Sequence, residues 1–274
     1  MTAAAELLAS VAEIARRAAA EILAVYESGA SDTRHKADAS PLTEADLRAH
    51  RLILRALAEL SPQLPVLSEE SPPEACAARR SWTRYWLVDP LDGTREFLGR
   101  NGEFTVNIAL IEDHRPTLGV VHVPVQNVSY QGLPGSGAWR QSGDGARQPI
   151  RARAHSDTPV RVVGSRSHRG DSLAAFLERL GPHQLLGVGS SIKVCLVAEG
   201  GADVYPRLGP TSEWDTAAAH AVLAAAGGAV LDLEGLPLAY NTREGLLNPS
   251  FVAFGPADRD WLALLAPPAG LGGT

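Results

Sequence analysis

The stretch WLVDPLDGT, residues 86–94, decides how the chain is interpreted. Its first three residues are apolar and predict a buried strand that runs directly into two aspartates, Asp89 and Asp92. Gly93 then lets the backbone turn sharply and approach a ligand. Two carboxylates and the intervening Leu91 carbonyl are the oxygen ligands that hard divalent cations prefer. The stretch therefore predicts a metal site at a strand end, with a turn capped by aspartate as the alternative.

The same stretch excludes one class of phosphatase. Enzymes that form an aspartyl phosphate use the pattern D-x-D-G-T after a strand, and here the residue two before Asp92 is Pro90. The covalent nucleophile is therefore missing, and we expect the attacking group to be a water activated by the metal. The backbone N–H groups of Gly93 and Thr94 are suited to hold a phosphate.

Further carboxylates occur where they can complete a metal site. Glu69 follows a second short apolar run, and open α/β sheets place their sites at such strand ends. Asp215 opens a predicted helix, where the helix dipole favours a carboxylate, so a simple cap is an equal alternative. Asp46 lies three residues after Thr43 and by itself reads as the partner in a capping box.

The second half of the chain contains residues suited to bind an anion. Ser190, Ser191 and Lys193 follow a glycine-rich turn at a predicted helix start, which is a natural anion site. Arg207 adds a planar donor that pairs well with phosphate. Taken singly, Lys193 and Arg207 are as easily explained as solvated surface charges.

Composition narrows the functional classes. The chain has 274 residues, with 25 Lys plus Arg, 31 Asp plus Glu and a formal net charge of −6, so nothing favours a nucleic-acid partner. No apolar stretch reaches the length of a membrane span, and no integral membrane segment is expected. Cys76 and Cys195 lie far apart without metal-ligand spacing and are expected to be reduced thiols. We expect a cytoplasmic protein, with peripheral association at the inner membrane face left open.

Hydrophobic periodicity predicts a layered fold. Amphipathic helices are expected over 3–27 and 44–60, followed by short apolar runs at 65–68 and 85–88. The runs 104–111, 118–123 and 127–131 read as strands of one antiparallel sheet. Helices and strands alternate over the second half. The pattern predicts an α/β sandwich in a single catalytic domain of two packed halves. These halves are a metal-binding α+β half over about 1–150 and an α/β substrate-binding half over about 151–265, with a tail at 266–274.

Together these motifs resemble the inositol monophosphatase superfamily of lithium-sensitive, magnesium-dependent phosphatases. DPLDGT at 89–94 and WDTAA at 214–218 are specific to the superfamily, whereas NGEFTVNIALI at 101–111 and GSSIK at 189–193 resemble its bacterial 3'(2'),5'-bisphosphate nucleotidases. The resemblance covers nearly the whole chain. It implies the layered α-β-α-β-α sandwich of the inositol monophosphatase and fructose-1,6-bisphosphatase type.

The resemblance also implies roles for individual residues. Two or three Mg²⁺ ions would be held by Glu69, Asp89, the Leu91 carbonyl, Asp92 and Asp215. The catalytic residues would be Asp46 and Thr94 as the water-activating pair, helped by Glu69. Gly93 and Thr94 would contact the scissile phosphate, and the remaining substrate contacts would come from His168, in SRSH, and from Ser190, Ser191, Lys193, Arg207 and Asp215.

The substrate implied is 3'-phosphoadenosine 5'-phosphate, a by-product of sulfur metabolism, which would yield AMP and phosphate. The alternative on the same fold is a phosphatase for inositol or sugar phosphates, and from another class a non-catalytic, metal-dependent nucleotide-binding protein. Two departures from the family bear on the pocket: Ala219 stands where glycine is frequent, and Glu213 adds a charge beside Asp215. The sequence leaves the oligomeric state open between monomer and homodimer.

Overall fold

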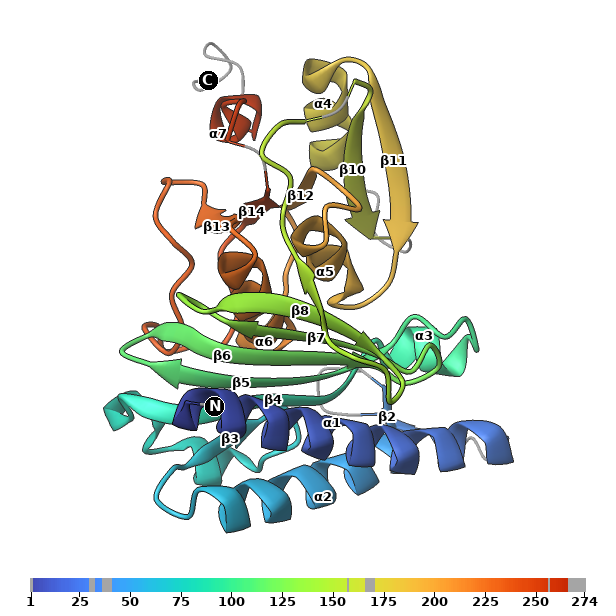
Figure 1. Cartoon of the computed structure of the whole chain (residues 1–274), viewed down its shortest axis with the longest axis vertical. Coiled ribbons are helices and arrows are strands. Elements are labelled where there is room, and N and C mark those ends of the chain that lie inside the picture. The colour runs from blue at the N-terminus through green and yellow to red at the C-terminus, as the bar shows by residue number, and fades with distance from the viewer. Residues whose placement is uncertain are drawn as a thin grey trace.

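The fold is built from two large β-sheets, a separate two-stranded sheet and seven α-helices within the described part of the chain (Figure 1). The computed structural model describes residues 2–29, 33–35, 41–156, 158–165, 171–255 and 257–265. None of the helices in these ranges is long and apolar enough to cross a membrane.

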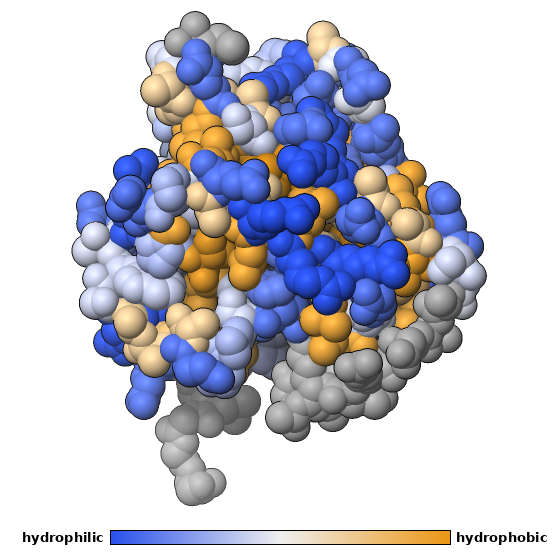
Figure 2. All heavy atoms as spheres, turned by 90° about the horizontal axis from the view of Figure 1, so that it is seen from below, coloured by the Kyte–Doolittle hydropathy of each residue, from blue (hydrophilic) through white to orange (hydrophobic). Residues whose placement is uncertain are grey.

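The two N-terminal helices form the outer layer on one side of the larger sheet. α1 (Ala3–Ser28) begins at the N-cap Thr2 and ends at Gly29, whose φ of 68° is the left-handed conformation that glycine adopts readily. α2 (Glu44–Leu60) begins at Thr43 with the predicted capping box to Asp46. Their apolar faces pack against the sheet, and hydrophilic side chains cross the middle of the face seen from below in Figure 2.

The larger sheet has seven strands in the order β3-β4-β5-β6-β7-β8-β9. The antiparallel pairing expected for the runs 104–111, 118–123 and 127–131 is confirmed in β5, β6 and β7, whereas β3 pairs with β4 in parallel. β8 and β9 were not predicted, since their partly exposed residues lack a continuous apolar run. The strands are β3 (Val66–Ser68), β4 (Arg84–Asp92), β5 (Thr105–Glu112), β6 (Arg115–Val123), β7 (Val128–Leu133), β8 (Gly137–Ser142) and β9 (Gln148–Ile150).

The smaller sheet has five strands in the order β11-β10-β12-β14-β13, with both parallel and antiparallel pairs. Its edge strand β11 was missed, because its first residues, His183 and Gln184, are exposed and polar. The strands are β10 (Val160–Ser165), β11 (His183–Val188), β12 (Val204–Arg207), β13 (Ala229–Asp232) and β14 (Phe251–Phe254). A separate pair, β1 (Thr33–His35) and β2 (Pro41–Thr43), precedes α2.

Helices α5 (Ile192–Ala198) and α6 (Glu213–Ala225) fill the space between the two sheets. α4 (Asp171–Leu180) and α7 (Trp261–Leu265) cover the far face of the smaller sheet. The layers thus run α-β-α-β-α, which confirms the predicted sandwich. α6 lies so close to the larger sheet that a Cβ atom on Gly119 would meet the Ala218 carbonyl oxygen at 2.2 Å.

Three short helices complete the chain. α3 (Thr94–Leu98) follows β4 directly. The 3₁₀ turns η1 (Pro73–Cys76) and η2 (Arg79–Ser81) lie between β3 and β4. The carboxylates expected to bind metal therefore lie just after β3, at the end of β4 and at the start of α6, and Asp46 lies on α2.

Candidate metal and phosphate site

Three aspartates converge between the larger sheet and α6. Asp89 and Asp92 lie at the end of β4, and Asp215 lies in the first turn of α6. One carboxylate oxygen from each lies within 4.8 Å of those of the other two. This spacing suits oxygen ligands around a divalent cation.

A bulge in β4 brings the first two aspartates together. Asp89 pairs with Asn107 and Asp92 with Thr105, so three steps along β4 match two along β5. In a regular strand, residues three apart point to opposite faces of the sheet. The extra residue of the bulge turns both carboxylates to the same side. The spacing that looked like a metal motif in the sequence works only because of this irregularity.

Burial and mutual repulsion both disfavour the charged forms of these three carboxylates. Burial, and then the nearby Glu69, Asp92 and Asp215 carboxylates, raises the pKa of Asp89 well above its usual range. Burial, with the charge of Asp92 next, raises the pKa of Asp215 to about 8. Burial also raises the pKa of Asp92, while Lys193 opposes that shift. A bound cation would remove this repulsion, so the residues present fit a metal site.

Glu69 lies beside the three aspartates but outside their tight group. It directly follows β3, and its backbone N–H donates to the Val88 carbonyl oxygen at 3.1 Å, which holds it next to the end of β4. Its carboxylate raises the pKa of Asp89 by charge and by a hydrogen bond. Its place agrees with the expected role in metal binding, although Asp89, Asp92 and Asp215 make up the tightest group.

Asp46 and Thr94 face each other as the expected pair. The Thr94 hydroxyl lies 3.5 Å from both Asp46 Oδ1 and the Leu91 carbonyl oxygen. Oδ2 of Asp46 accepts hydrogen bonds from the Thr43 backbone N–H at 2.8 Å and from the Thr43 hydroxyl at 2.5 Å. Asp46 therefore serves as the predicted capping residue and also presents its second oxygen to the site.

Gly93 is the N-cap of α3 with a φ of 93°, a conformation that side-chain-bearing residues rarely adopt. It also lines the pocket next to the aspartates. The turn expected from the sequence is therefore present, and it brings Thr94 to the start of a helix beside Asp92.

Two polar residues on β5 hold Asp92, and the sequence analysis missed both. The Thr105 hydroxyl and the Asn107 amide donate to Asp92 Oδ2 at 3.3 and 3.4 Å. Both also bind the Ser191 hydroxyl at 2.8 Å. Polar residues at positions i and i+2 of an otherwise apolar strand share one face, and that alternation was the signal that could have identified them.

A pocket of about 120 Å³ opens beside the aspartates. Its lining includes most of the expected substrate-binding residues, namely Gly93, Ser190, Ser191, Lys193, Arg207 and Asp215. A second pocket of about 190 Å³ adjoins it and shares Ser165, Tyr205 and Arg207. His168 lies in 166–170, outside the described residues, so its expected contact is not placed.

The two cationic residues of the pocket differ in their surroundings. Lys193 is buried, its ammonium donates to the Ser190 carbonyl oxygen and lies over the Tyr205 ring, 5.6 Å from its centroid, and burial lowers its pKa. Arg207 donates to the Pro210 carbonyl oxygen, and its buried Nε makes no hydrogen bond within the described residues. Neither is therefore an ordinary solvated surface charge.

The glycine-rich loop before α5 is held against the first half of the chain. The Gly189 N–H donates to Glu103 Oε2 at 2.8 Å. A Cβ atom on Gly189 would lie 2.7 Å from Glu96 Cγ and 2.9 Å from the Glu103 carbonyl oxygen. Glu103 was quoted in the sequence only as part of a motif, and the structure assigns it the role of fixing this loop.

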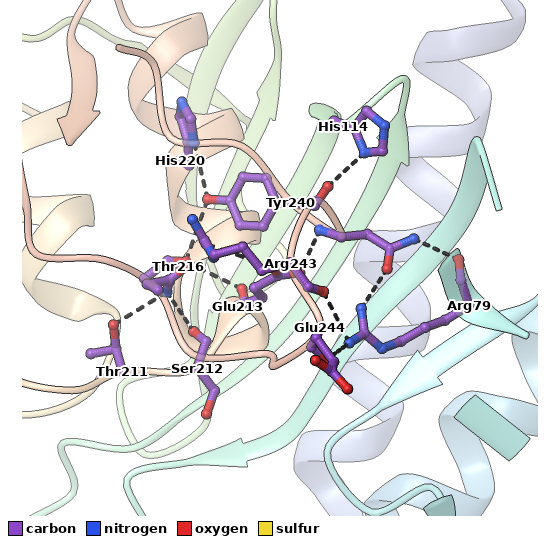
Figure 3. Close-up of polar contacts among 12 residues, drawn as sticks. Arg79, His114, Thr211, Ser212, Glu213, Thr216, His220, Tyr240, Arg243 and Glu244 are labelled. Atoms are coloured by element: carbon purple, nitrogen blue, oxygen red, sulfur yellow. Dashed lines mark hydrogen bonds and ion pairs between the residues drawn. The ribbon is translucent and has the colours of Figure 1, made fainter. Parts of the chain in front are cut away.

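The two departures from the family pattern lie away from the pocket. Ala219 is fully buried in the core between the sheets and does not line either pocket. Glu213 is also fully buried and faces a polar network around Asn241 and Arg243 (Figure 3). The methyl group of Ala219 therefore belongs to the core, because that face of α6 packs against the larger sheet and α5.

Comparison with known proteins agrees with this geometry. A family model described as the inositol monophosphatase family matches residues 2–266. The chain is 52% identical to the 3'(2'),5'-bisphosphate nucleotidase CysQ of Escherichia coli K12 over 246 residues, which cover 89% of this chain and 98% of that protein. It is 53% identical to the CysQ of Salmonella typhimurium over 247 residues, with the same coverage.

Solved structures show the same fold. The crystal structure of CysQ from Bacteroides thetaiotaomicron matches with a TM-score of 0.79 and 41% identity, covering 93% of this chain and 98% of that one. An inositol monophosphatase from Thermotoga maritima matches with a TM-score of 0.77 at 24% identity, covering 95% and 96%. The expected resemblance and the fold class are both confirmed.

Proposed function

Because the chain belongs to the inositol monophosphatase family, we propose that it is a magnesium-dependent 3'(2'),5'-bisphosphate nucleotidase. It would remove the 3'-phosphate of 3'-phosphoadenosine 5'-phosphate and release AMP, as part of sulfur metabolism in the cytoplasm. The observation that carries the proposal is the close group of Asp89, Asp92 and Asp215 beside a pocket lined by Lys193 and Arg207.

In this proposal Mg²⁺ would be held by five oxygen-bearing groups, and when bound it would supply charge stabilisation of the phosphate and polarisation for hydrolysis. Two or three ions fit the number of carboxylates. The repulsion that raises the pKa of Asp89 and Asp215 supports this assignment, since a bound cation relieves it. The groups are the side chains of Glu69, Asp89, Asp92 and Asp215 and the carbonyl of Leu91.

Asp46 and Thr94 would take up the proton of the attacking water. The Thr94 hydroxyl is placed to donate to Asp46 Oδ1, so its oxygen can accept a proton from the water. Two hydrogen bonds from Thr43 fix the Asp46 carboxylate, so the proton acceptor is pre-oriented. Glu69, beside Asp89, would help to place the same water.

The pocket residues would hold the substrate. The N–H groups of Gly93 and Thr94 at the start of α3 would receive the scissile phosphate. Lys193 and Arg207 would supply two positive charges to bind the 5'-phosphate of the bisphosphate. An inositol monophosphate has no second phosphate for them to bind. Ser190 and Ser191 also line the pocket, and His168 is a further proposed contact.

The test is phosphate release with Mg²⁺ from four compounds measured side by side. These are 3'-phosphoadenosine 5'-phosphate, 3'-AMP, inositol 1-phosphate and fructose 1,6-bisphosphate. We expect preference for the first, suppression by lithium, and no release in EDTA. Preference for inositol 1-phosphate or fructose 1,6-bisphosphate would replace this proposal with the inositol- or sugar-phosphate alternative, and no release would favour a binding protein.

The variant Arg207→Gln tests the proposed contact between Arg207 and the 5'-phosphate. We expect KM to rise about tenfold for the bisphosphate, as for loss of one charged hydrogen-bonding partner, and to change little for 3'-AMP. Arg84→Gln is the matched control, because Arg84 is an exposed residue paired with Glu112 on the surface of β4. Equal changes in KM for both nucleotides would show that Arg207 does not bind the 5'-phosphate.

A further inference from the structure

Glu213 is the first residue of α6 and lies two residues before Asp215, yet its side chain does not line the pocket and lies beside Arg243 instead (Figure 3). Its Oε2 accepts a hydrogen bond of 2.8 Å from the backbone N–H of Asn241. Oε1 lies 3.8 Å from the nearest nitrogen of Arg243, too far for a hydrogen bond. The main attachment of this fully buried carboxylate is therefore the Asn241 N–H.

Asn241 in turn binds Arg79 on a different part of the chain. Arg79 donates to Asn241 Oδ1 at 2.6 Å, and Asn241 Nδ2 donates back to the Arg79 carbonyl oxygen at 2.6 Å. The guanidinium also donates to the carbonyl oxygens of Arg243 and Glu244. Asn241 has a φ of 57°, which asparagine tolerates better than most residues. Both side chains are buried, so these bonds have no competition from water.

This chain of contacts connects the two elements that supply the aspartates. Arg79 opens η2, which leads into β4 and hence to Asp89 and Asp92. Glu213 opens α6 and sets the position of its first turn, which carries Asp215. The backbone N–H of Glu213 also donates to the Leu246 carbonyl oxygen at 2.8 Å, which ties the same helix start to the loop after Asn241.

We propose that Glu213, Asn241 and Arg79 form a buried clasp that sets the separation of Asp215 from Asp89 and Asp92, and thereby the affinity for the metal. The clasp touches neither the metal site nor the pocket, so these are positioning residues. The inference rests on the proposed function only in assuming that Asp215 is a metal ligand. Outer partners that orient metal ligands alter metal affinity about 10–100-fold when they are removed.

The experiment is calorimetric titration of the purified full-length protein with Mn²⁺ as the probe, for three variants and a control. Glu213→Ala removes the acceptor for the Asn241 N–H. Glu213→Gln retains an acceptor oxygen of the same reach. Asn241→Gly keeps the left-handed backbone and its N–H but removes the link to Arg79. Glu234→Gln is the control, since Glu234 is exposed in the turn after β13.

We expect Kd for Mn²⁺ to rise about tenfold in Glu213→Ala and Asn241→Gly and to stay within about twofold of wild type in Glu213→Gln and the control. Circular dichroism below the unfolding midpoint checks that each variant is folded. At saturating Mg²⁺, kcat for phosphate release should recover to near the wild-type value, because a structural defect alone would not be corrected by metal. If Glu213→Ala does not fold, Asn241→Gly carries the same test.

Two outcomes overturn the clasp. Folded Glu213→Ala and Asn241→Gly proteins with wild-type Kd values would show that Asp215 is placed without it. If the wild-type protein binds no Mn²⁺, the proposed metal site is wrong, and so are the proposed function and the clasp. The two failures are distinguished by whether the wild-type titration shows binding.

Discussion

The backbone N–H of Ser191 donates a hydrogen bond of 2.6 Å to Oδ2 of Asp92, although the two residues lie 99 positions apart in the chain. The loop before α5 therefore attaches directly to a proposed metal ligand. Lys193, two residues further on, opposes the rise in the pKa of the same carboxylate. The site is consequently a joint product of β4 and of the loop that carries the pocket hydroxyls.

Gly189→Ala should displace that loop. A methyl group at this position would lie 2.7 Å from Glu96 Cγ and 2.9 Å from the Glu103 carbonyl oxygen, so the Ser191 contact to Asp92 must move. Overpacking of this kind lowers the free energy of unfolding by about 1–3 kcal/mol. We expect kcat/KM for the bisphosphate to fall about tenfold, in line with the loss of correct positioning at a site. Gly245→Ala is the matched control, since nothing lies within 4 Å of the place that its methyl group would occupy.

Asp89→Asn should weaken metal binding and strengthen the metal-free fold at the same time. Burial and three neighbouring carboxylates raise the pKa of Asp89, so its charged form destabilises the folded state without metal. We expect the thermal midpoint in EDTA to rise by about 2–4 °C for each kcal/mol of repulsion removed. Phosphate release at limiting Mg²⁺ should fall about 100-fold. The control Asp113→Asn, in the exposed β5–β6 turn, should change neither the thermal midpoint nor phosphate release. A lower thermal midpoint for Asp89→Asn would contradict the proposed repulsion.

Gly119→Ala should lower the free energy of unfolding at a position outside the proposed metal and phosphate site. The added methyl would lie 2.2 Å from the Ala218 carbonyl oxygen and 2.7 Å from Ala221 Cβ, where α6 crosses β6. Because rigid backbone stands opposite, we expect the free energy of unfolding in urea to fall by about 3 kcal/mol, the upper end for overpacking. Gly209→Ala, which has open space around it, should change it by less than about 0.5 kcal/mol. Equal stabilities would mean that α6 sits farther from the sheet.

His122 should make the fold sensitive to acid. It is buried in β6 with Nδ1 2.8 Å from the Ser129 hydroxyl, and burial lowers its pKa from 6.5 to about 4. The unfolded chain therefore binds more protons between these values, and stability is lost as pH falls from about 6.5 to 4, by about 3 kcal/mol at the lower end. His122→Gln should lose less stability over this window than wild type in urea unfolding. His155→Gln, at an exposed histidine, should follow wild type.

The sequence by itself determined most of the local structure. The amphipathic pattern set α2 at Glu44–Leu60 as predicted, and the apolar runs 104–111 and 118–123 form β5 and β6, because periodicity depends only on neighbouring residues. The DPLDGT stretch likewise identified Asp89 and Asp92. The polar edge strand β11 was missed, since an exposed strand has no apolar period to reveal it.

Only the tertiary structure decided how the site is assembled. The bulge between Asp89 and Asp92, the amide of Ser191 on Asp92, and the connection from Arg79 through Asn241 to Glu213 each depend on packing between distant segments. Glu213 shows the limit most clearly, because its position beside Asp215 in the sequence suggested a charge added to the pocket. Residues two apart on a helix point in different directions, so the Glu213 side chain lies in a buried network with Asn241 whereas Asp215 lines the pocket.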